Sequence, residues 1–335
     1  MKGHCILAVL SLMAPGLSFA CGGVGAENHL NILGIGNSWT RDSFRYIYGI
    51  AESAGADVTV AHGYLGGSTL EDQFFGIDDE TYSYNHNGVR QLVHSTYQYW
   101  LYDGSDNPLK TPADSEYRNG LNGVGVTLES ILRDRDWDII IFQPSLSFMA
   151  RLPLYLGKDG HSSFSMAKFV EKVLSLLPEG RADKVKIGLM VPWSYAEGCT
   201  RHSPVAYKWN GGSEPSDQAG WDACFGALYK GIQKNAVELS RSMGRKCDYY
   251  VNVGRAVHIA RSNPLFDNCG YKLQRKQDNT HLAEGVAKYA ASLMFAYQVL
   301  GVKPFQITYC PSTYDFTPEL AAAARASSWK AAKCR

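Results

Sequence analysis

The feature that most constrains this chain is a repeated alternation of short apolar segments with helical stripes. Apolar residues recur at helical spacing between these segments, most clearly from Met166 to Leu177. Strands that are apolar throughout and joined by helices are typical of a parallel sheet covered on both faces. The sequence therefore predicts a three-layer α/β/α doubly wound sandwich with a five-stranded, mainly parallel sheet. The expected strands lie at 31–35, 58–62, 138–142, 185–191 and 249–253.

Two stretches interrupt the alternation. Residues 81–123 contain alternating aromatics, including Tyr97 and Tyr99, and then a turn-rich run, which predicts an inserted hairpin and loop. Residues 195–220 are rich in Gly, Ser and Pro and predict a second insertion. We therefore expect one domain over 31–310, a short linker over 21–30 before it, and a helical tail over 311–335 after it.

The first 20 residues have the pattern of a secretory signal peptide. Lys2 gives a short basic start, an apolar stretch too short for a membrane span follows, and Ser18 and Ala20 offer small residues at the cleavage positions. This predicts a secreted, periplasmic or cell-surface protein. Cys21 follows directly and leaves a lipid anchor open as an alternative. No other stretch is long and apolar enough to be a transmembrane segment.

Cysteine usage fits an exported protein. The C-terminal half holds six cysteines, which predict at least one disulfide, with free buried thiols as the alternative. None forms a CxxC pair or lies near a histidine at zinc-finger spacing, so a zinc knuckle is not expected. The charge balance argues against nucleic-acid binding, because 33 basic residues against 32 acidic ones leave no basic excess for contacting phosphates.

In doubly wound folds the ligand site lies at the carboxyl ends of the strands. The first expected strand ends in Gly36-Asn37-Ser38, which places Ser38 as a nucleophile would be placed at a strand-to-helix turn. A phosphate-binding turn or a plain helix N-cap would look the same.

The second and third strands end in further candidate groups. Gly66-Gly67 follows the second strand and could aim a backbone N–H at a developing negative charge. A plain loop is the alternative, since Ser68 to Glu71 also fits a helix capping box. Gln143 follows the third strand and either offers its side-chain N–H to the same pocket or satisfies the strand end.

Asp278 and His281 lie three residues apart shortly before the last strongly apolar helix. A carboxylate so placed can fix the tautomer of an imidazole and stabilise its protonated form. A single Asp-x-x-His is frequent by chance and is by itself weak.

Taken together, these blocks resemble the SGNH (GDSL-like) hydrolase superfamily, in the same order over roughly residues 31–300. The resemblance implies a flavodoxin-like sandwich in which Ser38 is the nucleophile, His281 the base and Asp278 its orienting partner. It also implies an oxyanion hole formed by the N–H groups of Ser38 and Gly67 and by the side chain of Gln143.

Two departures stand out, because better-known members have Gly-Asp-Ser in the first block and Asn in place of Gln143. Both variants resemble an uncharacterised bacterial branch of the superfamily with Gly-Asn-Ser and a C-terminal Asp-x-x-His. The residues expected to bind substrate are Asn37, Trp39, Tyr64 and Trp193.

The resemblance implies a serine esterase that works through an acyl-enzyme and needs no cofactor or metal. Exported members often deacylate glycans, and exposed aromatics near the cleft would suit stacking on sugar rings. The candidates are Tyr64, Trp193, Tyr207 and Trp209, with packing in the core or within loops as the alternative. We therefore expect a small-molecule or glycan ester as substrate. The alternatives are a lipid or lysophospholipid esterase and a non-catalytic carbohydrate-binding module.

Overall fold

The computed structural model describes residues 29–86, 88–94, 96–102, 126–146, 151–160, 162–195, 212–266, 273, 280–312 and 316–333. The expected signal peptide and Cys21 lie outside these residues, as do most of the two expected insertions.

A six-stranded sheet forms the centre of the molecule, with the strand order β5-β2-β1-β6-β7-β8. All neighbouring pairs from β2 to β8 are parallel, which confirms the predicted α/β class. Without β5, the strands in chain order read 2-1-3-4-5, the flavodoxin-like order. The parallel strands are β1 (Leu30–Gly36), β2 (Val58–Tyr64), β6 (Ile139–Phe142), β7 (Lys186–Met190) and β8 (Tyr249–Val251).

The sheet has one strand more than the sequence predicts. β5 (Gln98–Tyr102) pairs antiparallel with β2 and forms the edge. The expected hairpin is formed instead by β3 (Ser83–His86) and β4 (Val89–Leu92). Tyr99, Trp100 and Leu101 are all buried, so neighbouring residues of β5 are covered on both of its faces. That burial explains why the aromatic run belongs to the main sheet rather than to a half-exposed hairpin.

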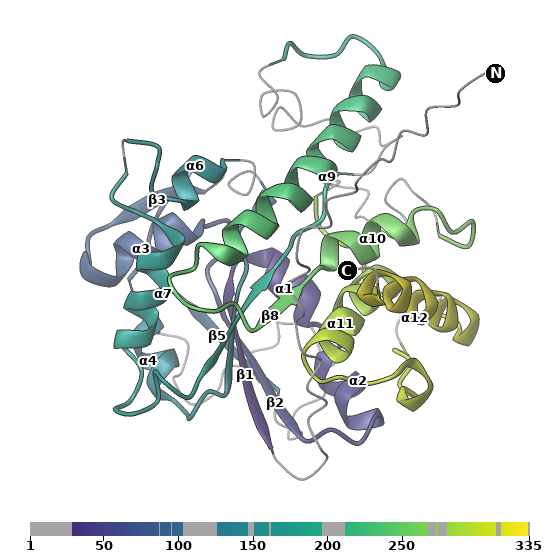
Figure 1. The fold of residues 1–335 in the computed structure, drawn as a ribbon, viewed down its shortest axis with the longest axis horizontal. Helices are drawn as coiled ribbons and strands as arrows, with labels where there is room; N and C mark the ends of the chain where they lie inside the picture. Colours follow the sequence, from purple (N-terminus) through teal and green to yellow (C-terminus); the bar gives the residue numbers. More distant parts are fainter. Residues whose placement is uncertain are drawn as a thin grey trace, which may run out of the picture.

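Helices cover both faces of the sheet (Figure 1). One group packs around β1, β2 and β8, and α11 lies at its centre, in contact with α1, α2, α10 and α12. Its members are α1 (Ser38–Phe44), α2 (Ile47–Ser53), α10 (Val253–Ala260), α11 (Val286–Gln298) and α12 (Pro318–Lys333). The other helices are α3 (Leu70–Asp78), α4 (Leu128–Arg133), α6 (Leu152–Tyr155), α7 (Met166–Ser175) and α9 (Gln218–Arg241), and a 3-10 turn spans Pro304–Gln306.

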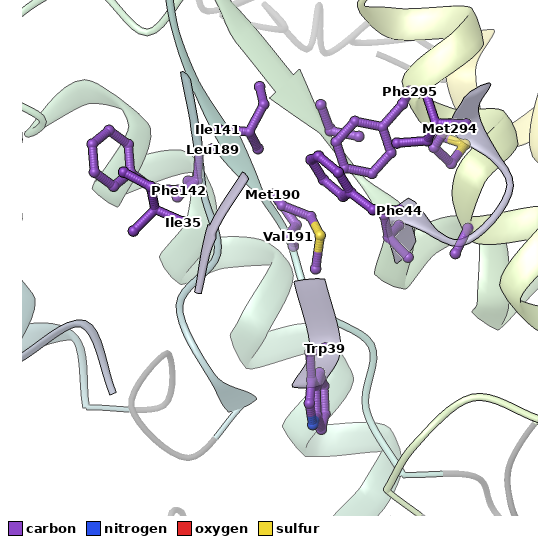
Figure 2. Packing of buried hydrophobic residues seen from close by; sticks show 14 of the residues in the cluster. Ile35, Trp39, Phe44, Ile141, Phe142, Leu189, Met190, Val191, Met294 and Phe295 are labelled. Atoms are coloured by element: carbon purple, nitrogen blue, oxygen red, sulfur yellow. The ribbon is translucent and has the colours of Figure 1, made fainter. Parts of the chain in front are cut away.

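Apolar side chains from both faces of the strands join the helices into one core (Figure 2). On one face Phe44 of α1 meets Phe295 of α11 edge-on, with ring centroids 4.8 Å apart. On the other, Phe142 of β6 packs edge-on against Phe169 of α7 at 5.5 Å. A Cβ atom at Gly34 would lie 2.7 Å from the Phe44 ring, so glycine is what lets α1 pack this closely on β1. Close packing of α1 fixes where Ser38 lies.

Cys224, Cys247 and Cys310 are free thiols, and burial raises the pKa of Cys247 to about 12. Cys199, Cys269 and Cys334 lie outside the described residues, so the disulfide stays a prediction. Within the described ranges no helix has the length and apolarity needed to cross a membrane. No cluster of three potential metal ligands occurs in that same part of the chain.

Candidate active site

The structure brings together Ser38 and His281, which are 243 residues apart in the sequence. Ser38 is the first residue of α1, directly beyond the carboxyl end of β1, and His281 lies in the segment that leads into α11. The Ser38 Oγ and the His281 Nε2 are 2.7 Å apart, a hydrogen-bond distance. An imidazole so placed can take the serine proton as the oxygen attacks.

The other ring nitrogen of His281 faces Thr280, whose Oγ1 lies 3.3 Å from the His281 Nδ1. Asp278, the expected orienting carboxylate, lies outside the described residues. Its place beside the Nδ1 therefore stays a prediction.

Asn37 shapes the turn that presents Ser38. Its Oδ1 accepts the Trp39 N–H at 3.1 Å and so caps α1, while its Nδ2 donates to the Ser68 carbonyl at 2.8 Å. Asn37 is buried, with both ends of its amide engaged within the protein. A carboxylate could accept the first bond but could not donate the second. This explains why asparagine suits the first block here, and it makes Asn37 part of the turn.

Gln143 is also buried, directly beyond β6, and its side chain holds the same turn. Its Oε1 accepts the Asn37 N–H at 3.3 Å and the Thr40 hydroxyl at 3.1 Å, while its Nε2 donates to the Pro144 carbonyl at 2.5 Å. These partners fix the orientation of the amide, because the Asn37 N–H can only donate and the Pro144 oxygen can only accept. Among the described residues, the second Nε2 proton has no acceptor.

Gly67 lies in a tight turn after β2 and has a φ of +67°, in the left-handed region that favours glycine. A Cβ atom there would lie 1.9 Å from the Nδ1 of His86, which packs over the turn from the β3–β4 hairpin. The capping box expected at Ser68 begins one residue later, because the N-cap of α3 is Thr69.

The expected substrate-binding aromatics differ sharply in exposure. Trp193 is fully buried, so the expectation of an exposed ring there is wrong. Its ring stacks on that of Trp39, with centroids 4.2 Å apart and planes 8° from parallel. Tyr64 is half-buried, and the Arg41 guanidinium lies 5.4 Å from its ring centre. Tyr207 and Trp209 lie outside the described residues.

His62 lies within β2, and the structure buries it among aromatic rings. Burial, and secondarily the charge of Arg41, lowers the pKa of His62 to about 3. Neither ring nitrogen has a hydrogen-bond partner among the described residues. His62 is therefore a neutral core residue.

Sequence reasoning missed Asp42 and Lys288. Asp42 of α1 is fully buried and forms an ion pair of 3.1 Å with the buried Lys288 of α11. The Asp42 Oδ2 also accepts the N–H of Leu282 at 2.9 Å, and Leu282 directly follows His281 in the sequence. The available signal was a carboxylate four residues after Ser38, a spacing that places two residues on the same face of a helix.

Comparison with known proteins shows the fold. A DUF4886 family protein from Bacteroides uniformis aligns with a TM-score of 0.65 and 18% identity, over 91% of this chain and 95% of that one. No family model and no curated protein matches the chain.

Two further structures are more distant. An acetyl xylan esterase aligns with a TM-score of 0.34 and 12% identity, over 80% of this chain and 98% of that one. The periplasmic domain of a lipopolysaccharide acetyltransferase from Salmonella ser. Paratyphi A aligns with a TM-score of 0.37 and 12% identity, over 80% of this chain and 81% of that one. These two likenesses are too weak to carry an argument about this chain.

Proposed function

We propose that this protein is a serine esterase that removes acyl groups from carbohydrate substrates through an acyl-enzyme. The observation that carries the proposal is the 2.7 Å contact between the Ser38 Oγ and the His281 Nε2. It lies at the carboxyl ends of the parallel strands, where doubly wound folds bind ligands.

In the first half-reaction the Ser38 Oγ attacks the ester carbonyl while the His281 Nε2 takes its proton. The resulting tetrahedral intermediate collapses when the protonated His281 gives that proton to the leaving alcohol, and the acyl group stays on Ser38. In the second half-reaction the same nitrogen activates water, which releases the acid and restores the serine. Asp278, three residues before His281, is proposed to orient the imidazole from its Nδ1 side.

The negative charge on the carbonyl oxygen needs hydrogen-bond donors, and three are proposed. Among the described residues, the backbone N–H groups of Ser38 and Gly67 have no acceptor within the protein. The third donor is the remaining Nε2 proton of Gln143. Donors fixed in place before the reaction stabilise such a charge without reorganisation, which is why they lower the barrier.

The carbohydrate part of the proposal rests on the resemblance of the motifs to a superfamily whose exported members often deacylate glycans. Tyr64, half-buried at the carboxyl end of β2 and beside Arg41, is proposed to meet a sugar ring. A wide apolar surface around Ser38 would instead favour the lipid esterase alternative.

The test is hydrolysis of p-nitrophenyl acetate and release of acid from acetylated and methyl-esterified polysaccharides. Ser38→Ala should abolish both activities. Ser53→Ala is the matched control, because its hydroxyl bonds only the Ile50 carbonyl at the end of α2. Wild-type turnover of lipid esters alone would favour the lipid esterase. A wild-type protein that binds glycans and hydrolyses no ester would be the non-catalytic module.

A further inference from the structure

The segment that carries His281 is held on both sides by side chains linked to the helix of the nucleophile. We propose that Trp193 and Asp42 are positioning residues that fix the backbone around His281 and so keep the base in register with Ser38. This inference rests on the proposed esterase function and concerns how its catalytic pair is held together.

Trp193 holds the residue before His281. It follows β7, is fully buried, and donates its indole N–H to the Thr280 carbonyl at 2.8 Å. The same indole stacks on Trp39, the residue after Ser38, with ring centroids 4.2 Å apart. One side chain therefore contacts the immediate neighbour of the nucleophile with its face and the immediate neighbour of the base with its nitrogen.

Asp42 holds the residue after His281. Its Oδ2 accepts the Leu282 N–H at 2.9 Å, and its Oδ1 faces the ammonium of Lys288 at 3.1 Å. Both side chains of the pair are almost entirely buried, so water does not screen their attraction. Lys288 also contacts Glu284, one turn earlier. Because Lys288 is on α11, the pair fixes the carboxylate that holds the Leu282 N–H.

Trp193 and Asp42 both connect the backbone around His281 to α1. Asp42 lies one helical turn after Ser38 on that helix, and Trp193 is stacked on its second residue, Trp39. A small displacement of α1 would therefore carry the His281 segment with it and preserve the distance between Oγ and Nε2. That distance matters because a displacement of about 1 Å in a reacting group can cost on the order of a hundredfold in rate.

Trp137 offers a matched comparison for Trp193. It too is almost fully buried, and its indole N–H donates to a backbone carbonyl, that of Ile131, at 3.1 Å. Trp137 lies just before β6, at the amino-terminal end of the sheet and away from Ser38. The two tryptophans make the same kind of bond, and only one of them makes it beside His281.

The first experiment compares Trp193→Phe with Trp137→Phe in p-nitrophenyl acetate hydrolysis and thermal melting. Phenylalanine keeps a ring for stacking but loses the donor. Both variants should melt earlier, since each loses the hydrogen bond of a buried indole and part of the apolar surface that the indole buries. Only Trp193→Phe should lower kcat, by about tenfold to a hundredfold, with KM little changed.

The second experiment tests Asp42 without leaving Lys288 as an unpaired buried charge. Asp42→Asn with Lys288→Met keeps an oxygen that can accept the Leu282 N–H, whereas Asp42→Leu with Lys288→Met removes it. Both double variants neutralise the ion pair, and the second should also melt earlier, because it leaves the buried Leu282 N–H without this acceptor. The first should keep kcat within a few fold of wild type, and the second should lose about tenfold to a hundredfold.

The outcomes separate this inference from the proposed function. Wild-type turnover that Ser38→Ala abolishes establishes the function before any variant is compared. If kcat of Trp193→Phe then equals that of Trp137→Phe, and the two double variants have equal kcat, both residues only stabilise the fold and the inference is wrong. A wild-type protein with no esterase activity would overturn the function and the inference together.

Discussion

Two regions of this molecule place an imidazole against a hydroxyl, at opposite ends of the same strands. Beyond the carboxyl end of β1, the His281 Nε2 lies 2.7 Å from the Ser38 Oγ. Before the amino end of β1, the His29 Nε2 lies 2.9 Å from the Thr59 Oγ1, and its Nδ1 lies 2.8 Å from the Asp57 carboxylate. Both ring nitrogens of His29 contact described side chains, so this second site has a complete Asp-His-hydroxyl arrangement.

The surroundings differ in what they offer a substrate. Ser38 starts a helix and has a backbone N–H with no acceptor among the described residues. Asn37, directly before it, donates to the carbonyl of Ser68, directly after the glycine turn at 66–67. Thr59 lies within β2 and is almost fully buried, so a carbonyl group cannot reach it. We therefore expect that a hydrogen-bonded triad is not sufficient for an active site. Nearby donors for the developing charge and an accessible nucleophile decide which pair can catalyse.

The largest expected effect is that of His281→Ala, and His29→Ala is its counterpart at the second site. His281→Ala should lower kcat for p-nitrophenyl acetate by about 10⁴-fold or more, because it removes the base. His29→Ala should leave kcat within a few fold of wild type, since its contacts tie only the amino ends of β1 and β2. Comparable losses in both variants would contradict the distinction between the two sites.

The next effect tests the carboxylates. Asp278→Asn should lower kcat by about 10²- to 10⁴-fold with little change in thermal stability, because it disturbs the tautomer and charge of His281 rather than removing it. Asp57→Asn is the counterpart at the other site and should leave kcat unchanged. An active Asp278→Asn enzyme would show that another group orients His281.

The next prediction concerns Gln143, the side chain proposed to donate a hydrogen bond to the oxyanion near Ser38, for which the Thr59 site has no proposed equivalent. Gln143→Ala should lower kcat by about 10²- to 10³-fold with KM little changed, as expected for a lost oxyanion donor. Thr40→Val is the control, because it removes one hydrogen bond to the Gln143 Oε1 and leaves the Nε2 in place. If Gln143→Ala keeps its kcat and only melts earlier, the side chain merely holds the nucleophile turn.

The smallest effect concerns His62, a third imidazole that makes neither kind of contact. Its pKa falls from 6.5 to about 3 because burial disfavours the charged ring. The unfolded chain therefore binds more protons between these pH values, so the stabilising contribution is complete above pH 6.5 and is lost progressively as the pH falls toward 3.

His62→Phe should remove this dependence. Thermal melts between pH 4 and pH 7 should show a shallower decline for the variant than for wild type, by up to about 1.4 kcal/mol per pH unit. An identical pH dependence in both proteins would show that His62 is not held neutral by burial.

Most of the fold could be predicted from local pattern. Parallel strands buried on both faces read as continuous apolar runs, and the five expected strands correspond to β1, β2, β6, β7 and β8. β5 could not be predicted, because it lies outside the alternation of strands and helices that identifies the parallel strands. Its pairing with β2 depends on tertiary contacts, which the local sequence does not encode. The same alternating aromatics would fit a hairpin or an added strand equally well.

The site shows the same division. Ser38 and His281 follow strands or precede a helix in a recognisable order, so the sequence singles them out. The roles of Trp193 and Asp42 depend on bonds to backbone groups 87 and 240 residues away, and no local pattern encodes such bonds. The burial of Trp193 likewise follows from its stacking on Trp39 and could not be read from the chain.

The most direct test of the central claim is to locate a covalent fluorophosphonate label by peptide mass spectrometry. A serine activated by an imidazole attacks the phosphorus, and a bond from Oγ to phosphorus forms as fluoride leaves. We predict a single label on Ser38, formed in the wild type and in His29→Ala but absent in His281→Ala. No label on Ser38, or equal labelling in His281→Ala, would contradict the claim that Ser38 and His281 form the catalytic pair.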